Sequence, residues 1–404
     1  MEKVTSEAAL RKAAVEMGPD GIEAGVRGRI RAWIEELVEA ELTAALGADV
    51  SERPGASREG YRHGHRARTL STSLGPTTFQ LPRARLQTPD GDTREWQSTV
   101  VPRYQRRTGR VDEALLGVYL SGTNGRRIRS ALAPLLKGAP LSKDAVSRLT
   151  GRLAGDFAAW RTRDLAEEQI RYLFLDGWYP KVRLGKQRVR VPVLVTLGVC
   201  ADGRRILLDL RMAGEESAAA WREVVESLVA RHIGVPVLAV IDGNPGLPTA
   251  LRTAWPTIEV QRCTAHKLRN LQAKAPARWR EELTEDYRRM IYAESALAVQ
   301  KARGSFTKKW RLRCPAVVAS LEEAGDELFT FVRFPIAQWK ALRTTNALER
   351  INEEFRRRVK TQGSLPSQDA VMLLLFGLLR SGQIRLRALV GYHDMGKVTE
   401  RPAA

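Results

Sequence analysis

The chain has 404 residues, of which 43% are hydrophobic, so it can bury a large core and should divide into about two to four units. Lysine and arginine outnumber aspartate and glutamate by 66 to 46, which gives a formal charge of +20, a pI near 10.3 and an attraction for polyanions. The three cysteines, Cys200, Cys263 and Cys314, are too few and odd in number for a disulfide framework, so a reducing compartment is expected.

Nucleic acid and an anionic membrane are the two candidate partners for such a charge. The longest apolar runs, residues 191–200 and 370–379, are shorter than the roughly 20 residues that a membrane-spanning helix needs. The N-terminus has no apolar signal-peptide core. We therefore expect a soluble cytoplasmic protein that binds nucleic acid and no membrane.

Residues 1–52 have the three- and four-residue spacing of apolar side chains that is typical of an amphipathic helix. The apolar positions are Ile30, Trp33, Ile34, Leu37, Val38 and Leu42. We interpret this helical region first as a packing or dimerisation element, with the segment around Trp33 as the candidate interface. Direct DNA contact through Arg27, Arg29 and Arg31 is the alternative.

Residues 53–110 are rich in Pro, Gly, Thr and Arg and contain short β-prone pieces. The segment has twelve arginines, no lysine and four acidic residues, a local excess of 12 − 4 = +8. Because guanidinium groups form forked contacts with phosphates, this basic segment is predicted to contact DNA, with a solvated linker as the alternative. The candidate contacts are Arg62, Arg66, Arg68, Arg83 and Arg85.

Residues 111–165 return to helical periodicity, with three helical stretches separated by turns. Ser142 is a candidate N-cap for the last stretch, whose first turns would then present polar side chains as a helix-turn-helix DNA reader does. Those side chains are Lys143, Ser147, Arg148 and Arg152. A plain three-helix packing unit explains the same pattern equally well.

Residues 166–266 predict an α/β fold, with a mixed sheet flanked by helices. Three successive β-runs are followed by a helix beginning near Glu215, a buried strand, a short helix and a further strand. A meander of three strands followed by βα units describes the first part of a ribonuclease H-like catalytic core. In the first β-run Tyr172, Phe174 and Asp176 share one face, so Asp176 should end that face of a central strand.

Three carboxylates lie at the ends of two β-runs and at the start of a basic helix: Asp176, Asp242 and Glu349. Ligand sites of open α/β sheets lie at the carboxyl ends of strands. Taken singly, each acid also has a structural explanation, because Asp-Gly is a common turn and Asn346 with Glu349 fits a capping box. Together, in a basic α/β protein, they predict a site for two Mg²⁺ ions, with Mn²⁺ able to substitute.

Asp242 and Glu349 are separated by 349 − 242 = 107 positions, too many for one βα connection. Residues 267–340 are therefore predicted to form an all-helical insertion domain, after which residues 341–385 complete the core and residues 386–404 form a tail. Trp310 lies in a basic run and can stack on a DNA base, although burial in a helical core is the preferred interpretation. The candidate DNA contacts in this half are Lys267, Arg269, Lys308, Lys309, Trp310, Arg356 and Lys360, the last two on the helix face of Glu349.

Four ordered blocks resemble the Mutator-type transposases of bacterial insertion sequences: YLFLDGWYPKVR, VIDGNPGL, QRCTAHKLRNL and TTNALERINEEFRRRVKTQG. With the upstream segment YRHGHRARTLSTSLGPTTFQLPRAR, the similarity covers roughly residues 60–380. The resemblance implies a DDE transposase whose metal-binding and catalytic triad is Asp176, Asp242 and Glu349.

Near the triad, Cys263 and His266 match the C-x-x-H signature of that family. They supply two of the four ligands that a structural zinc ion needs, so a hydrogen-bonded His266 near the active site is the preferred interpretation. The chain departs from the family pattern at Trp178 and Arg350, which lie beside the triad residues. We therefore carry over the catalytic residues of the family but not a DNA-sequence preference.

The resemblance implies a protein that binds the terminal inverted repeats of an insertion sequence, cleaves DNA at the element ends and joins the 3′-hydroxyl to target DNA. It also implies double-stranded DNA as the partner, a homodimer, and association with a bacterial nucleoid. Two alternatives stay open: a ribonuclease H-like resolvase or nuclease that does not join strands, and a domesticated DNA-binding protein, which would be expected to have lost at least one of the three acids.

Overall fold

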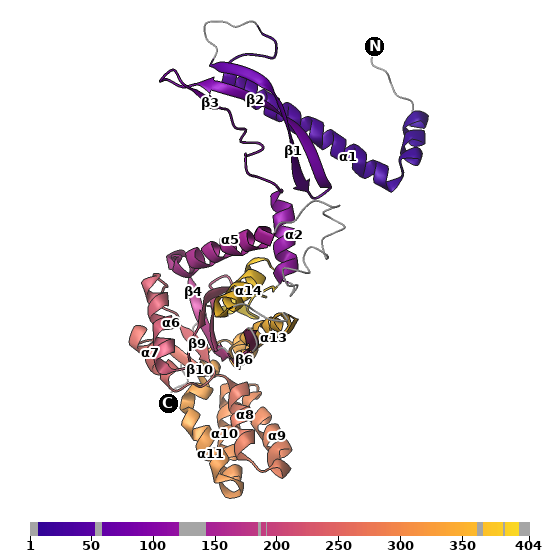
Figure 1. Cartoon of the computed structure of the whole chain (residues 1–404). Helices are drawn as coiled ribbons and strands as arrows, with labels where there is room; N and C mark the ends of the chain where they lie inside the picture. Colours follow the sequence, from indigo (N-terminus) through magenta and orange to yellow (C-terminus); the bar gives the residue numbers. More distant parts are fainter. Residues whose placement is uncertain are drawn as a thin grey trace. The chain divides into compact units, whose positions relative to one another are not determined.

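The computed structural model describes residues 7–52, 59–120, 143–184, 187–190, 192–361, 367–382 and 384–395. The chain divides into two compact units, residues 1–149 and 150–404, each with its own hydrophobic core (Figure 1). Within these described residues, no helix combines the length and the apolar character needed to cross a membrane.

In the first unit, a long helix packs against a three-stranded antiparallel sheet (Figure 1). Alternate side chains of the middle strand are buried, because successive residues of a strand point to opposite faces. On the buried face, Phe79 and Leu81 pack with Val38 of the helix and Leu70 of the first strand. The elements are α1 (Glu7–Leu46), β1 (Gly60–Thr72), β2 (Gly75–Gln87) and β3 (Thr93–Glu95), and the strand order is β1-β2-β3.

Helix α1 buries only part of its apolar surface. The predicted amphipathic helix is present, and Val38 and Leu42 are fully buried as expected. Three of the six predicted apolar positions are exposed instead. They belong to a longer set at helical spacing, here called the exposed α1 stripe: Ile22, Val26, Ile30, Trp33 and Leu37.

Two helices follow the sheet. Helix α2 (Gly109–Leu120) buries Val111 and Leu115, and helix α5 (Lys143–Thr162) leads into the second unit. Residues 121–142, which contain Ser142 and the middle predicted helix, lie outside the described residues, so the helix-turn-helix remains a prediction.

The second unit is built on a mixed five-stranded sheet, which confirms the predicted α/β class. Its strand order is β10-β9-β4-β7-β8, and β4, β7 and β8 form an antiparallel meander, whereas β4, β9 and β10 run parallel. A separate hairpin of β5 (Lys181–Leu184) and β6 (Gln187–Arg190) lies between β4 and β7 in the chain. The sheet strands are β4 (Ile170–Trp178), β7 (Val193–Cys200), β8 (Arg205–Met212), β9 (Leu238–Ile241) and β10 (Glu259–Arg262).

Helices cover both faces of this sheet, which explains why strands such as β7 are buried along their whole length (Figure 1). Helices α6 (Ala218–Ala230) and α7 (Gly246–Ala254) pack on the face that carries Leu173 and Leu175. On the opposite face, Trp178 of β4 packs against Phe355 of α13 (Asn346–Thr361), with ring centroids 5.7 Å apart. Helix α14 (Gln368–Arg380) also lies on that side (Figure 1).

Short helices fill the chain between β10 and α13. In their core, the ring of Phe306 contacts those of Tyr287 and Trp310, and the Trp310 indole donates a hydrogen bond to Asp286 at 3.0 Å. The burial of Trp310 confirms the preferred interpretation of this residue. The α-helices are α8 (Thr264–Lys274), α9 (Arg280–Ile291), α10 (Ala296–Arg313), α11 (Pro315–Ala324) and α12 (Ile336–Leu342). The short 3₁₀ helices of the unit are η1 (Ala166–Glu168), η2 (Ala277–Trp279), η3 (Gly325–Leu328), η4 (Thr330–Arg333) and η5 (Tyr392–Asp394).

Candidate active site

Asp176 and Asp242 lie side by side at the carboxyl ends of two neighbouring strands. Strands β4 and β9 are parallel, and Leu175 of β4 is in register with Ile241 of β9. Each aspartate is the next residue along its strand, so both side chains are at the same edge of the sheet. This edge is where open α/β sheets bind ligands. Although β4 is antiparallel to β7, it is parallel to β9, and that pairing brings the two acids together.

The Asp176 carboxylate is buried, with 4% of the residue exposed. Burial raises the pKa of Asp176 well above its usual value, because the charged form loses its hydration, and the nearby Asp242 carboxylate raises this pKa further. The side chain of Asn352, from α13, donates a hydrogen bond to Asp176 Oδ2 at 3.3 Å. The Asn352 Oδ1 atom is buried and has no hydrogen-bond partner within the described residues.

Asp242 is held in the turn that follows β9. Its Oδ1 atom accepts a hydrogen bond from the Asn244 backbone N–H at 3.1 Å. Gly243 has φ +134°, and a Cβ atom there would lie 2.9 Å from Arg262 Nη2, so the turn requires glycine. The predicted Asp-Gly turn is therefore present. Asp242 accepts a backbone hydrogen bond in this turn through Oδ1, which is compatible with a role of the same carboxylate in the site.

Glu349 lies in the first turn of α13. Its Oε1 atom is 2.9 Å from Arg269 Nη2 and 4.0 Å from His266 Nε2, both on α8. The charge of Glu349 also contributes to the raised pKa of Asp176, so the three carboxylates belong to one electrostatic cluster. Asn346 is the first residue of the helix, and the backbone N–H of Glu349 donates to Thr345 O at 3.0 Å.

Cys263 and His266 lie beside these carboxylates. Cys263 directly follows β10 and is fully buried, where its sulfur accepts hydrogen bonds from Thr345 N at 3.4 Å and Thr345 Oγ1 at 3.5 Å. The Cys263 side chain and the charges of Asp176 and Asp242 raise the pKa of His266 to about 9. His266 is therefore cationic at neutral pH and partly offsets the negative charge of the carboxylates.

The carboxylate cluster suits a hard divalent cation. Carboxylate oxygens are the ligands that Mg²⁺ prefers, and Asp242 and Glu349 lie close enough to Asp176 to raise its pKa beyond the effect of burial. In the described part of the chain, no three His, Cys, Asp or Glu side chains are close enough together to hold one ion. Oε1 of Glu349 is paired with Arg269, so this oxygen would have to exchange Arg269 for the metal in order to bind it.

Comparison with known proteins assigns the family. The model of the family described as "Transposase, Mutator family" matches residues 1–384. The chain belongs to the Mutator family of transposases. The resemblance that its four sequence blocks predict is thereby confirmed.

Three relatives of this Mutator-family chain are transposases of insertion sequence elements. The transposase of ISRM5 from Rhizobium meliloti is 33% identical over 355 residues, which cover 88% of this chain and 86% of the relative. The transposase of IS406 from Burkholderia multivorans is also 33% identical, over 88% of this chain and 89% of the relative. The transposase of IS905 from Lactococcus lactis is 28% identical, over 85% of each chain.

Membership of the Mutator family implies DNA as the partner, but several predicted DNA contacts have structural roles instead. Arg62 donates to Glu39 Oε1 at 3.1 Å, to Thr43 Oγ1 at 2.7 Å and to two backbone carbonyls that follow α1. Arg68 donates to the carbonyls of Val101, Pro102 and Gln105. Both guanidinium groups are thus occupied in holding the first unit together, which corrects the expectation that they are free for DNA.

Two predicted contacts of the transposase's second unit are buried. The Lys267 ammonium group donates to Ser320 O at 2.9 Å and to Glu323 Oε2 at 2.7 Å, and only 3% of the residue is exposed. Trp310 is fully buried. Neither side chain can contact DNA in this conformation, so the DNA-binding prediction is wrong for both. Lys309 is half-buried and forms ion pairs with Glu282 and Asp286.

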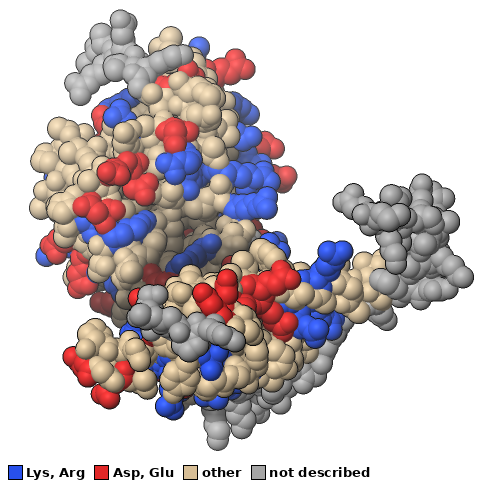
Figure 2. Space-filling view, turned by 90° about the horizontal axis from the view of Figure 1, so that it is seen from above, with Lys and Arg blue, Asp and Glu red and all other residues tan. Residues whose placement is uncertain are grey.

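The remaining predicted DNA contacts differ in exposure. Arg83 is paired with Glu95 at 2.9 Å. The side chains of Lys143 and Lys360 lie outside what the structure describes. Figure 2 shows Lys and Arg side chains mixed with Asp and Glu over the visible face, so exposure alone does not define a DNA path. The exposed candidates are Arg66, Arg85, Ser147, Arg148, Arg152, Arg269, Lys308 and Arg356.

Sequence reasoning missed three groups around the site. Nothing in the local sequence of Asn352 indicates its hydrogen bond to Asp176. The same holds for Arg262, which donates to the carbonyl of Gly243 at 3.3 Å, and for Thr345, which donates to the sulfur of Cys263. All three contacts join segments that are distant in the sequence, so no spacing rule reveals them.

Proposed function

We propose that the protein is a DDE transposase that cleaves DNA at the ends of an insertion sequence and joins the 3′-hydroxyl to target DNA. One observation carries the proposal: in a chain of the Mutator family, Asp176 and Asp242 adjoin at the ends of parallel strands within the electrostatic reach of Glu349. The substrate would be double-stranded DNA, recognised at the terminal inverted repeats of the element.

We also propose a ribonuclease H-like catalytic core with an all-helical insertion. The antiparallel meander β4-β7-β8, followed by α6, β9, α7 and β10, supports the core, because it is the order that the sequence predicts for this fold. The helices α8 to α12 separate β10 from α13, in the place expected for the insertion.

In this proposal Asp176, Asp242 and Glu349 hold two Mg²⁺ ions, for which Mn²⁺ can substitute. Bound there, the ions would activate a water or a 3′-hydroxyl and stabilise the leaving oxygen. Asn352 orients the Asp176 carboxylate through its hydrogen bond. Arg269 is an exposed cation beside Glu349, so its guanidinium group is suited to a phosphate of the reacting strand.

A homodimer would allow the protein to bring two DNA ends together. The exposed α1 stripe supports this proposal, because apolar side chains at helical spacing on a surface mark interaction sites. A second copy of the same helix is the partner that we propose for it.

The test uses three variants, Asp176→Asn, Asp242→Asn and Glu349→Gln, with Asp202→Asn as the matched control. Asp202 is an exposed acid in the turn after β7, where it pairs with Arg204. In Mg²⁺, the rates of end cleavage and of strand joining should both fall more than about 100-fold in each triad variant. A loss of that size exceeds the roughly 10- to 100-fold effect that is typical of residues that only support a metal ligand. The control should keep its activity.

The assay follows a labelled element end joined to a supercoiled target. A folded triad variant that joined strands at the wild-type rate would refute the assignment of that acid. Cleavage without any joined product in the wild-type reaction would favour the resolvase or nuclease alternative instead.

A further inference from the structure

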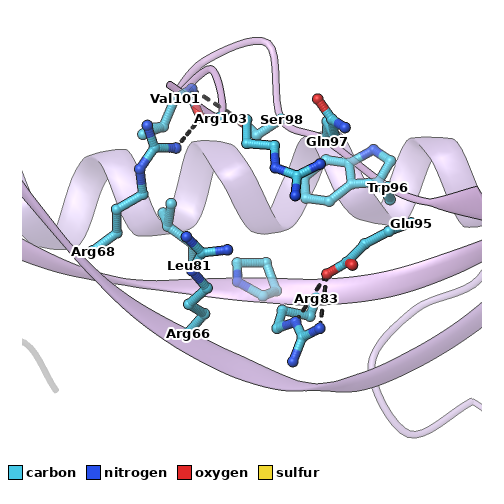
Figure 3. Close-up of a pocket in the computed structure, with 11 residues that line it drawn as sticks. Arg66, Arg68, Leu81, Arg83, Glu95, Trp96, Gln97, Ser98, Val101 and Arg103 are labelled. Carbon is cyan, nitrogen blue, oxygen red and sulfur yellow. Dashed lines mark hydrogen bonds and ion pairs between the residues drawn. The ribbon is translucent and has the colours of Figure 1, made fainter. Parts of the chain in front are cut away.

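The first unit contains a small basic pocket between the sheet and the segment that follows β3. The pocket has a volume of about 80 Å³, room for a few water molecules or one small anionic group and too little for a base pair. Four arginines and one glutamate contribute to its lining, beside the indole of Trp96 (Figure 3). The arginines are Arg66, Arg68, Arg83 and Arg103.

Two of the four arginines already have partners. Arg83 forms two hydrogen bonds with Glu95, at 2.9 and 3.0 Å (Figure 3). Arg68 donates hydrogen bonds to the carbonyls of Val101, Pro102 and Gln105, but these uncharged groups do not neutralise its positive charge. The pocket therefore retains an excess of positive charge.

The other two arginines, Arg66 and Arg103, are exposed and form no hydrogen bond or ion pair with the described residues. Their side chains line the same pocket from different elements, Arg66 from β1 and Arg103 from the segment after β3 (Figure 3). The Glu95 carboxylate offsets one of the four arginine charges of the lining, and the remaining positive charge favours the binding of an anion.

The backbone that carries these arginines is held in place. Arg66 is in a paired strand, in register with Leu81. The segment before Arg103 is fixed to α1 by Glu41, whose carboxylate accepts hydrogen bonds from Ser98 Oγ and Thr99 N. The hydrogen bonds of Arg68 to carbonyls on both sides of Arg103 hold that segment further. Less conformational entropy is lost on binding when the support is ordered beforehand.

We propose that Arg66 and Arg103 grip one phosphate of the DNA backbone in this pocket. Guanidinium forks match the geometry of phosphate oxygens, and the limited volume selects a single phosphate group. The contact would be independent of base sequence and would position the first unit on the duplex. The inference rests on the proposed function insofar as that function supplies DNA as the ligand.

The experiment measures binding of the full-length protein to a short fluorescent duplex of arbitrary sequence, in EDTA, over a range of salt concentrations. The slope of log Kobs against log [salt] is negative, and the loss of one phosphate contact reduces its magnitude by about 0.9. Arg66→Gln and Arg103→Gln should each weaken duplex binding about tenfold at low salt. This factor corresponds to the lower end of the free energies found for hydrogen bonds to charged groups. Because both arginines serve one phosphate, the double variant should lose about 0.9 in slope and not about 1.8.

Arg94→Gln is the matched control, since Arg94 is an exposed arginine of β3 that does not line the pocket. It should leave the slope within error of the wild-type value. An unchanged slope in the folded double variant would overturn the proposal, as would a decrease of about 1.8 in the magnitude of its slope, which indicates two separate contacts. No metal is present in this assay, so its outcome is independent of whether the triad variants retain strand joining.

Discussion

The side-chain amide of Asn352 lies 3.3 Å from Oδ2 of Asp176, and this hydrogen bond joins helix α13 to the end of strand β4. Asn352→Ala should leave the Asp176 carboxylate without this orienting contact. We expect strand joining to fall about 10- to 100-fold, the usual effect of losing a residue that supports a metal ligand. The dependence on Mg²⁺ should also shift to higher concentrations, which a purely structural role would not cause. Glu353→Gln, at the adjacent exposed position, is the control. Wild-type kinetics in Asn352→Ala would show that the hydrogen bond has no role in the reaction.

The burial of Asp176 predicts a metal-free protein that becomes less stable as the pH rises. Its pKa is raised in the folded state, so the unfolded chain releases this proton first. The stability linked to Asp176 is thus complete below about pH 4 and is lost as the pH rises towards the folded-state pKa.

Asp176→Asn cannot ionise and should therefore unfold at a higher temperature than the wild type near pH 7. For a domain of this size, each ~1 kcal/mol in the free energy of unfolding shifts the Tm by about 2–4 °C. The difference should disappear near pH 4, and Mg²⁺ should reduce it at neutral pH by stabilising only the wild type. A variant that is less stable than the wild type in EDTA near pH 7 would contradict this explanation.

The burial of the Lys267 ammonium group, which pairs with the exposed Glu323, predicts an effect on stability without an effect on DNA binding. Lys267→Met should destabilise the protein by about 1–3 kcal/mol, because Ser320 O and Glu323 lose a charged donor. Denaturant unfolding measures this loss, and duplex binding by the folded variant should match the wild type. Lys308→Met is the exposed control and should leave the stability unchanged. Weaker DNA binding by a fully stable Lys267→Met protein would revive the original DNA-binding prediction.

The exposed α1 stripe predicts self-association. Trp33 is 60% exposed, and Trp33→Lys places a charge within the stripe. Sedimentation velocity should show a shift from dimer towards monomer, because an uncompensated charge is costly in an apolar interface. Ala32→Lys introduces the same group one position away from the stripe and should remain dimeric. Equal sedimentation of Trp33→Lys and the wild type as dimers would exclude this helix as the interface.

The sequence was sufficient to predict how the strands present the two aspartates. Asp176 and Asp242 each follow a run of apolar residues. Because side chains alternate along a strand, Asp176 is predicted on the same face of β4 as Tyr172 and Phe174. In the structure this face of β4 packs against Phe334 and helix α13. Patterns of this kind depend only on local spacing, so one sequence reveals them.

The roles of the basic residues could not be predicted in this way. Arg62 and Lys267 look like DNA contacts in a +20 chain, yet each is bound by an acid far away in the sequence, Glu39 and Glu323. Whether a cation faces solvent or an acid is decided by tertiary packing. The β-prone pieces expected in the basic segment that carries Arg66 are nevertheless present, as strands β1 and β2.

The contact between Trp178 and Phe355 constrains how this transposase can be recombined with its relatives. The ring of Trp178 packs between β4 and the helix that carries Glu349. A smaller side chain at position 178 would leave a cavity under α13. A helix taken from a relative with a different side chain at position 355 would therefore pack at a different distance from the sheet. A working chimaera therefore has to exchange both aromatic positions as a matched pair.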